Sequence, residues 1–102
     1  MISDFDVRQL QKMKLQLAAF RRGDLSLGGF IGDMDFLLNV IEDIPLDWKQ
    51  RVHECVATLE EVYAIGLDLG YAEVDEQGQG FVVEATEEIQ RCLEEIIIPG
   101  PY

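Results

Sequence analysis

The stretch LGGFIGDMDFLLNVI, residues 27–41, decides the fold class because its apolar residues recur at helical spacing. These residues are Leu27, Phe30, Ile31, Met34, Leu37, Leu38 and Ile41. Steps of three and one residues place them along one side of an α-helix and leave the polar residues on the other. The sequence therefore predicts an amphipathic helix that starts near Asp24 or Ser26, either of which could cap it, and is ended by Pro45.

Two segments on either side carry the same periodicity. The first is capped by Ser3 and stopped by Gly23, and its apolar residues are Phe5, Leu10, Met13, Leu17 and Phe20. The other starts with Asp47 as its cap and ends near Gly66 and Gly70. Its apolar residues are Trp48, Val52, Cys55, Val56, Leu59, Val62, Tyr63 and Leu67. We expect Trp48 and Tyr63 to lie in the core.

A last helix is predicted to begin at Thr86 as its cap, with the apolar stripe Ile89, Cys92, Leu93, Ile96 and Ile97. Before it, residues 71–84 admit two interpretations. Residues 71–74 could pair with residues 81–83 as a short hairpin, or the whole segment could be an irregular loop. The sequence thus predicts one all-α domain over residues 1–102, a compact four-helix bundle with an optional short β-hairpin before the last helix.

The charge of the chain restricts its partners. It has 102 residues, 20 acids and 8 bases, and a net charge of −12. Such a balance argues against nucleic acid and anionic membranes as ligands, because phosphate binding needs lysine and arginine. Residues 1–22 hold five bases and two acids, whereas the remainder holds three bases and eighteen acids. The first helix is therefore expected to lie as a basic strip against the acidic helices and to neutralise part of their field.

The N-terminal residues lack a basic-then-apolar signal pattern, and no apolar run is long enough for a membrane span. The two cysteines, Cys55 and Cys92, are not spaced as a zinc pair and are too few for a disulfide-stapled scaffold, so we expect buried core thiols. These features together predict a cytoplasmic protein.

No constellation for catalysis or metal binding is predicted. Asp33 and Asp35 are two positions apart on a helix and so do not face each other. Residues 75–86 begin like a calcium loop, but the twelfth position is Thr86 where an acid is required, which favours a turn. His53 has no nucleophile oriented beside it, since Cys55 points elsewhere on the same helix. We expect no enzyme activity, no metal and no cofactor.

The acids instead suggest a binding surface. Residues 32–48 carry five carboxylates and no cation. The candidate partner-binding residues are Asp33, Asp35, Glu42, Asp43, Asp47, Glu54, Glu60 and Glu61. They form either a solvated helix face or a negative surface that steers a cationic protein partner.

Part of the chain adds a resemblance. FRRGDLSLGGFIGDMDFLLNVIEDIPLDW (residues 20–48) and LEEVYAIGL (residues 59–67) contain a set of spaced residues. These are Phe20, Arg21, Gly23, Ile31, Asp33, Met34, Asp35, Leu37, Leu38, Trp48, Leu59, Glu60, Val62, Tyr63 and Ala64. Their pattern resembles small bacterial immunity proteins, which are encoded beside secreted toxin domains that include those of contact-dependent growth inhibition.

The resemblance implies a mostly helical protein that binds and blocks a toxin, frequently a nuclease. A nuclease must be basic to hold nucleic acid, so an acidic inhibitor can occupy or flank its groove. We therefore expect an immunity protein that neutralises a cognate basic toxin domain through its acidic surface. The alternative is a small helical self-associating or adaptor module without a toxin partner, which buries the glycine-bearing face of residues 27–41 against a second copy. The oligomeric state stays open.

Overall fold

The computed structural model describes residues 3–68 and 76–96, and the secondary structure within these ranges is entirely helical. The helices are α1 (Asp4–Arg22), α2 (Leu27–Val40), α3 (Leu46–Asp68) and α4 (Glu76–Glu95). The prediction of an all-α chain is confirmed. The optional hairpin is not, because residues 81–83 lie inside α4; residues 71–74 fall outside the described ranges.

Helix α1 begins and ends where the sequence predicts. The Ser3 side chain accepts a hydrogen bond from the Asp6 N–H at 3.1 Å. At the other end, Gly23 adopts the left-handed conformation (φ 84°), and its N–H returns to carbonyls of the preceding turn. A side chain would be strained at this φ, so glycine suits the position. Of the predicted stripe, Leu10, Met13 and Leu17 are buried, whereas Phe5 is exposed.

Helix α2 is capped by Ser26, whose side chain accepts a backbone N–H at 3.0 Å. The helix ends at Val40, so the predicted end at Pro45 is wrong. Ile41 turns to an extended conformation (φ −69°, ψ 133°), and the next two N–H groups bind the carboxylate of Asp6. A side chain from another helix thus ends α2 before proline does.

Helix α3 begins at Leu46, and the prediction that Asp47 caps it is wrong. The carbonyl of Pro45 already accepts a hydrogen bond from the Lys49 N–H at 3.2 Å, which closes the first helical turn. Proline needs no N–H partner there, so it is well placed just before the helix. Asp47 lies in the first turn, where its charge favours the positive end of the helix.

The two aromatic residues predicted for the core by α3 behave differently. Trp48 is buried, and its indole N–H donates to the Cys92 carbonyl of α4 at 2.7 Å. Tyr63 is 41% exposed, so its predicted core position is wrong. Its ring covers Gly28 of α2 instead: a Cβ added at Gly28 would lie 3.1 Å from the tyrosine hydroxyl oxygen. Glycine therefore lets α2 and α3 approach closely here.

Helix α4 starts ten residues earlier than predicted, at Glu76 instead of Thr86. Thr86 is buried inside the helix, and its hydroxyl contacts the carbonyls of Val82 and Val83 at 2.9 and 3.0 Å. This bonding to the preceding turn satisfies a hydroxyl that would otherwise favour a cap. The interpretation of residues 75–86 as a turn is likewise wrong from Glu76 onward.

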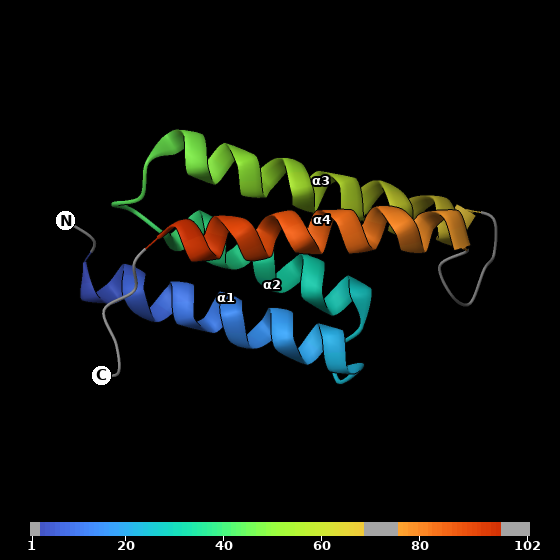
Figure 1. Ribbon diagram of the computed structural model, residues 1–102, viewed down its shortest axis with the longest axis horizontal. Helices are drawn as coiled ribbons and strands as arrows, with labels where there is room; N and C mark the ends of the chain where they lie inside the picture. The colour runs from blue at the N-terminus through green and yellow to red at the C-terminus, as the bar shows by residue number, and fades with distance from the viewer. Residues whose placement is uncertain (1–2, 69–75, 97–102) are drawn as a thin grey trace.

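The helices pack around one core, and each contacts two neighbours (Figure 1): α1 packs against α2 and α4, and α3 packs against α2 and α4. The rings of Phe20 and Phe30 stack at 4.8 Å between α1 and α2. Every helix contributes fully buried residues, namely Leu10, Met13, Phe30, Met34, Val52, Val56, Leu59, Ile89 and Cys92. These apolar side chains supply the main driving force for folding.

Helices α3 and α4 extend past the ends of α1 and α2 at the end of the molecule where α2 begins (Figure 1). This projecting pair carries several large apolar side chains in contact with solvent, including Ile65, Phe81 and Val83. None of the helices, over the residues described, combines the length and apolar character that crossing a lipid bilayer requires.

Candidate functional site

The eight acids predicted to bind a partner lie on α2, on α3 and in the loop between them. Asp33 and Asp35 belong to α2, Glu42 and Asp43 to the loop, and Asp47, Glu54, Glu60 and Glu61 to α3. Among the described residues, none of the eight forms an ion pair. The ion pairs that do form use other acids, namely Asp24, Glu88 and Glu95. The predicted site therefore keeps its negative charge uncompensated by contacts within the described chain.

Asp35 and Glu60 bring two carboxyl groups together where α2 meets α3. The hydrogen bond between the two side chains and the charge of Asp35 raise the pKa of Glu60, and partial desolvation acts in the same direction. The electrostatic effect of His53, which lies seven residues earlier on α3, lowers the pKa of Glu60 in part. A positive group placed beside this pair would relieve the repulsion, because an opposite charge favours ionised carboxylates.

Asp33 faces the other way along α2. Its carboxylate accepts a hydrogen bond from the Gln16 side-chain amide of α1 at 2.6 Å. The separation of Asp33 from Asp35 follows from their spacing on the helix. Asp33 also lines a hollow of about 320 Å³ between α1 and α2, with the exposed side chains of Leu15 and Phe36 beside it.

The α2–α3 loop presents Glu42 and Asp43, and both side chains are exposed. Their backbone N–H groups donate to the Asp6 carboxylate at 3.1 and 2.7 Å. Asp6 is completely buried in the first turn of α1. The sequence gives no local signal that connects Asp6 with a loop so far along the chain.

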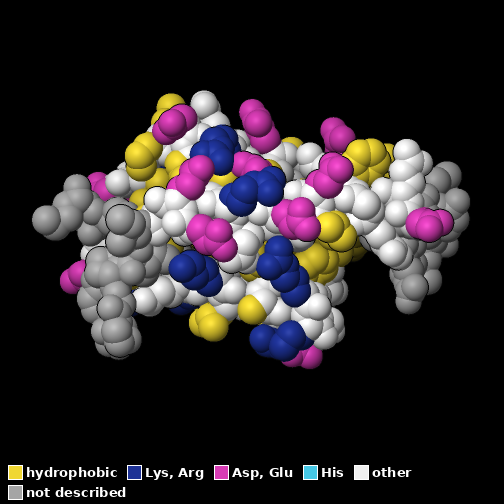
Figure 2. Space-filling view, viewed as in Figure 1, with side chains coloured by type: hydrophobic (Ala, Val, Ile, Leu, Met, Phe, Trp, Pro, Cys, Tyr) yellow, Lys and Arg dark blue, Asp and Glu magenta, His cyan; other side chains and the backbone are white. Residues whose placement is uncertain are grey.

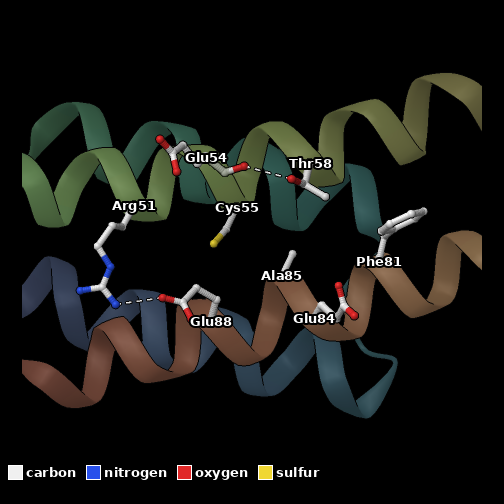
Figure 3. Close-up of a pocket in the computed structure, with 8 residues that line it drawn as sticks. All are labelled: Arg51, Glu54, Cys55, Thr58, Phe81, Glu84, Ala85 and Glu88. Carbon is white, nitrogen blue, oxygen red and sulfur yellow. Dashed lines mark hydrogen bonds and ion pairs between the residues drawn. The ribbon is translucent and has the colours of Figure 1, made fainter.

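A groove of about 370 Å³ lies between α3 and α4 (Figure 3). Helix α3 contributes Arg51, Glu54, Cys55 and Thr58, and α4 contributes Phe81, Glu84, Ala85 and Glu88. The sulfur of Cys55 points toward the gap between the helices, and the ring of Phe81 lies at one end (Figure 3). Of the eight predicted acids, only Glu54 lines this groove.

Ion pairs tie α3 to α4 at the other end of the groove. Arg51 of α3 contacts Glu88 at 2.9 Å and Glu95 at 2.6 Å on α4. Within α4 itself, Arg91 contacts Glu88 at 2.7 Å. Hydrogen bonds from Arg51 and then Arg91 hold the pKa of Glu88 below its ordinary value. Figure 2, viewed with α4 in front, shows lysine and arginine side chains interspersed with acids on this face. Acids and bases are therefore paired on this face, whereas the eight predicted acids form no ion pair with a described residue.

The basic strip of α1 contributes little to this pairing. Arg22 pairs with Asp24 just beyond its own helix at 3.0 Å. Arg21 reaches α4, where it donates to the Gln90 side chain at 3.0 Å and to the Thr86 carbonyl at 3.5 Å. Over the described ranges no cation of α1 forms an ion pair with an acid of another helix, so the expected neutralisation is not made by direct pairs.

Both cysteines are buried free thiols, as predicted. Burial is the main reason that the pKa of Cys55 is raised to about 11, and burial also raises the pKa of Cys92. Such thiols are poor nucleophiles at neutral pH. In the part of the chain that the structure describes, no group of three or more histidine, cysteine or acidic residues could hold a metal ion.

Several surface residues escaped sequence reasoning. Phe81 and Glu84 of α4 could not be connected with Thr58 of α3, because the sequence leaves residues 71–84 open between a hairpin and a loop. Leu15 and Phe36 lie outside the apolar stripes of their helices, and this position was the signal that could have revealed them as exposed.

No family model, curated protein or solved structure matches this chain. Its function has to be inferred from the chain's own chemistry.

Proposed function

We propose that this chain is an immunity protein, which binds a cognate toxin domain stoichiometrically and blocks it without catalysis. The observation that carries the proposal is the absence of ion pairs at all eight predicted acids among the described residues. Acids that serve only solubility on a helix surface commonly gain from nearby cations of opposite sign. Acids left without them provide a field that attracts a basic partner.

The Asp35–Glu60 pair is the most specific part of this surface. Two helices hold these carboxyl groups together at a cost, since the pKa of Glu60 is raised by its neighbour. A lysine or arginine of the partner placed there would remove the repulsion and form charge-assisted hydrogen bonds. The exposed acids of the α2–α3 loop, Glu42 and Asp43, would extend the contact, while rim charges would act mainly on the association rate.

A basic nuclease domain fits this surface best. Its nucleic-acid groove must be positive, and an acidic protein seated in or beside the groove excludes the substrate by both charge and volume. The scaffold is a four-helix bundle in which each helix packs on two neighbours, which gives the acids a rigid base. Inhibition takes place in the cytoplasm, where such a toxin would meet nucleic acid. The resemblance of residues 20–67 to immunity proteins supports the same function.

Co-expression tests the proposal. The toxin domain encoded beside this gene is produced with wild-type protein, with Asp35→Lys/Glu60→Lys, or with Glu87→Lys/Glu94→Lys as a control of equal charge change on α4. We expect the wild type and the control to restore growth and to form a complex in size-exclusion chromatography, and the α2–α3 variant to do neither. Growth arrest with all three proteins would reject the immunity function. Equal protection by all three would reject this surface.

Self-association is the second candidate, and one observation favours it. Leu15 and Phe36 are 67% and 64% exposed and line the same hollow between α1 and α2. Gly32 of α2 is also open, since a Cβ added there would meet no atom within 4 Å. A second copy covering this face would bury these groups. Sedimentation velocity at micromolar concentration distinguishes the candidates, because a monomer at all concentrations contradicts self-association.

A further inference from the structure

The hollow between α1 and α2 is lined by apolar side chains that the described chain leaves uncovered. It measures about 320 Å³ and lies where the two helices run side by side (Figure 1). Leu15 of α1 and Phe36 of α2 both line it, and both are more than half exposed. Gly32, one turn before Phe36, leaves open space beside it, since an added Cβ would meet no atom within 4 Å. Large apolar side chains gathered in this way are typical of an interaction surface.

Opposite charges line the same hollow, one on each helix. Lys12 belongs to α1 and forms no ion pair with a described residue. Asp33 of α2 accepts a hydrogen bond from the neutral Gln16 side chain at 2.6 Å, so no cation of the described chain compensates its charge. A partner that matches this face carries apolar groups at its centre, an acid for Lys12 and a base for Asp33. The face itself has this composition.

Two-fold symmetry allows such a face to bind a second copy of itself, because every contact between two residues then occurs twice with the copies exchanged. Helices α1 and α2 are antiparallel neighbours, and the residues that line their hollow lie at about the same level along both helices. A two-fold axis along the helices keeps this level and places α1 of each copy over α2 of the other. Leu15 then meets Phe36, and Lys12 meets Asp33.

We propose that two copies of this chain form a two-fold dimer through the α1–α2 face, with Leu15 of each copy on Phe36 of the other and Lys12 paired with Asp33. The dimer rests on self-association, the second candidate function, and adds to it the face, the symmetry and the charge pairing. The acids Asp35 and Glu60 stay accessible, because they lie where α2 meets α3. Dimerisation is therefore compatible with the immunity function and presents two acidic surfaces.

The size of the face sets the strength of the dimer. Helix α2 has 14 residues. A rise of about 1.5 Å per residue makes it about 21 Å long, and two neighbouring helices are about 20 Å across. A face of these dimensions is at the lower end of specific interfaces, so we expect a weak dimer with a Kd on the order of 10–1,000 µM.

Sedimentation velocity between about 5 and 1,000 µM covers this range of Kd. We expect the wild type to pass from monomer to dimer as its concentration rises. Leu15→Gln/Phe36→Gln should weaken the dimer about tenfold or more, because the apolar contact is lost twice. The control Ile65→Gln/Val83→Gln replaces two other apolar residues that are more than half exposed, on α3 and α4, and should dimerise like wild type.

Two results of this experiment would overturn the dimer. A wild type that stays monomeric at every concentration rejects self-association as a whole. A dimer that Leu15→Gln/Phe36→Gln retains at wild-type strength keeps self-association but rejects the α1–α2 face.

Charge reversal tests the two-fold pairing. Lys12→Glu sets an acid against Asp33 of the other copy, and Asp33→Lys sets a base against Lys12. Each variant alone should therefore dimerise about tenfold more weakly than wild type or worse. In an equal mixture the two variants form two attractive pairs, and dimerisation should return to within a few-fold of wild type. This recovery would also show that both variants are folded. A mixture no stronger than the separate variants would overturn the pairing.

The neighbouring toxin separates the dimer from the immunity function. Leu15→Gln/Phe36→Gln should restore growth like wild type when it is co-expressed with the toxin, because the acidic surface lies elsewhere. If this variant fails to protect and the wild type is a monomer, the face binds the toxin instead of a second copy, which overturns the dimer and keeps the immunity function. If no protein protects but the dimer forms as described, the immunity function is rejected and the dimer stands.

Discussion

The carboxylate of Asp6 accepts a hydrogen bond from the backbone N–H of Asp43 at 2.7 Å. The same carboxylate binds the N–H of Glu42 at 3.1 Å. Asp6 is in the first turn of α1 and is completely buried, while Asp43 belongs to the loop after α2. One buried side chain therefore ends α2 and fixes the loop that carries two of the exposed acids.

Replacing Asp6 with alanine should destabilise the fold strongly. The substitution leaves two backbone N–H groups of the loop without their acceptor, and we expect the free energy of unfolding to fall by about 2–4 kcal/mol. Urea unfolding followed by circular dichroism measures this loss. Asp4→Ala is the control, because Asp4 is an exposed acid in the same turn and should cost less than about 1 kcal/mol. Similar losses for the two variants would contradict a structural role of the buried carboxylate.

The Asp35–Glu60 pair predicts a dependence of stability on pH. The pKa of Glu60 is raised above its ordinary value of 4.5, so the folded state holds this proton more tightly than the unfolded state does. The contribution of Glu60 is therefore most favourable below pH 4.5 and is lost as the pH rises through its raised pKa. The free energy of unfolding of Glu60→Gln should therefore rise relative to that of wild type as the pH increases from 4 to 7. Urea unfolding across this range measures the difference.

Two controls belong to that experiment. Glu61→Gln removes the neighbouring exposed acid, which forms no hydrogen bond or ion pair with a described residue, and it should not reproduce the change with pH. Because Glu60 is largely exposed, the effect should also shrink in 1 M salt, where the Debye length falls to about 3 Å. A pH dependence that is the same for both variants would show that the carboxyl pair does not cause it.

Local chemistry explains which parts of the fold the sequence predicted well. Ser3 and Gly23 act on backbone groups within one turn, so the limits of α1 were visible from neighbouring residues. The start of α4 could not be predicted from neighbouring residues, because Thr86 is typical of a helix cap and residues 77–80 are rich in glycine and glutamine. A threonine hydroxyl can instead bond to the preceding turn of a helix, and packing on α3 decides between these states.

The candidate site depended on contacts that span longer distances along the chain. The sequence predicted that Asp33 and Asp35 would diverge, but it could not show that one meets Gln16 and the other Glu60. The groove is similar: Glu54 and Glu84 belong to different helices, and only the packing of α3 on α4 places them along one concavity. Residue type predicted the charge of the surface, and the tertiary structure decided where that charge gathers.

The buried thiols should react slowly in the native protein. Burial raises the pKa of Cys55 to about 11 from an ordinary value of 9.0. At pH 8 the folded protein then holds about a hundredfold less thiolate at this position than an unperturbed thiol would. We expect iodoacetamide to label Cys55 at least that much more slowly without urea than in 8 M urea, as measured by peptide mass spectrometry. Cys92, whose pKa is also raised by burial, should likewise react more slowly in the native protein. Native labelling within severalfold of the denatured rate would contradict the burial of both thiols.

The glycines of α2 provide a test of the close approach between α2 and α3. A Cβ at Gly32 would meet no atom within 4 Å, so Gly32→Ala should stabilise the helix by about 0.5–1 kcal/mol through lower backbone entropy in the unfolded chain. At Gly28 the same methyl would lie 3.1 Å from the Tyr63 hydroxyl oxygen and 3.2 Å from its ring, which offsets the gain. In a Tyr63→Ala background, Gly28→Ala should recover a gain close to that of Gly32→Ala. Urea unfolding of wild type, Gly28→Ala, Tyr63→Ala and the double variant measures the coupling between the two positions. Equal gains at both glycines with Tyr63 in place would mean that the tyrosine ring does not press on α2.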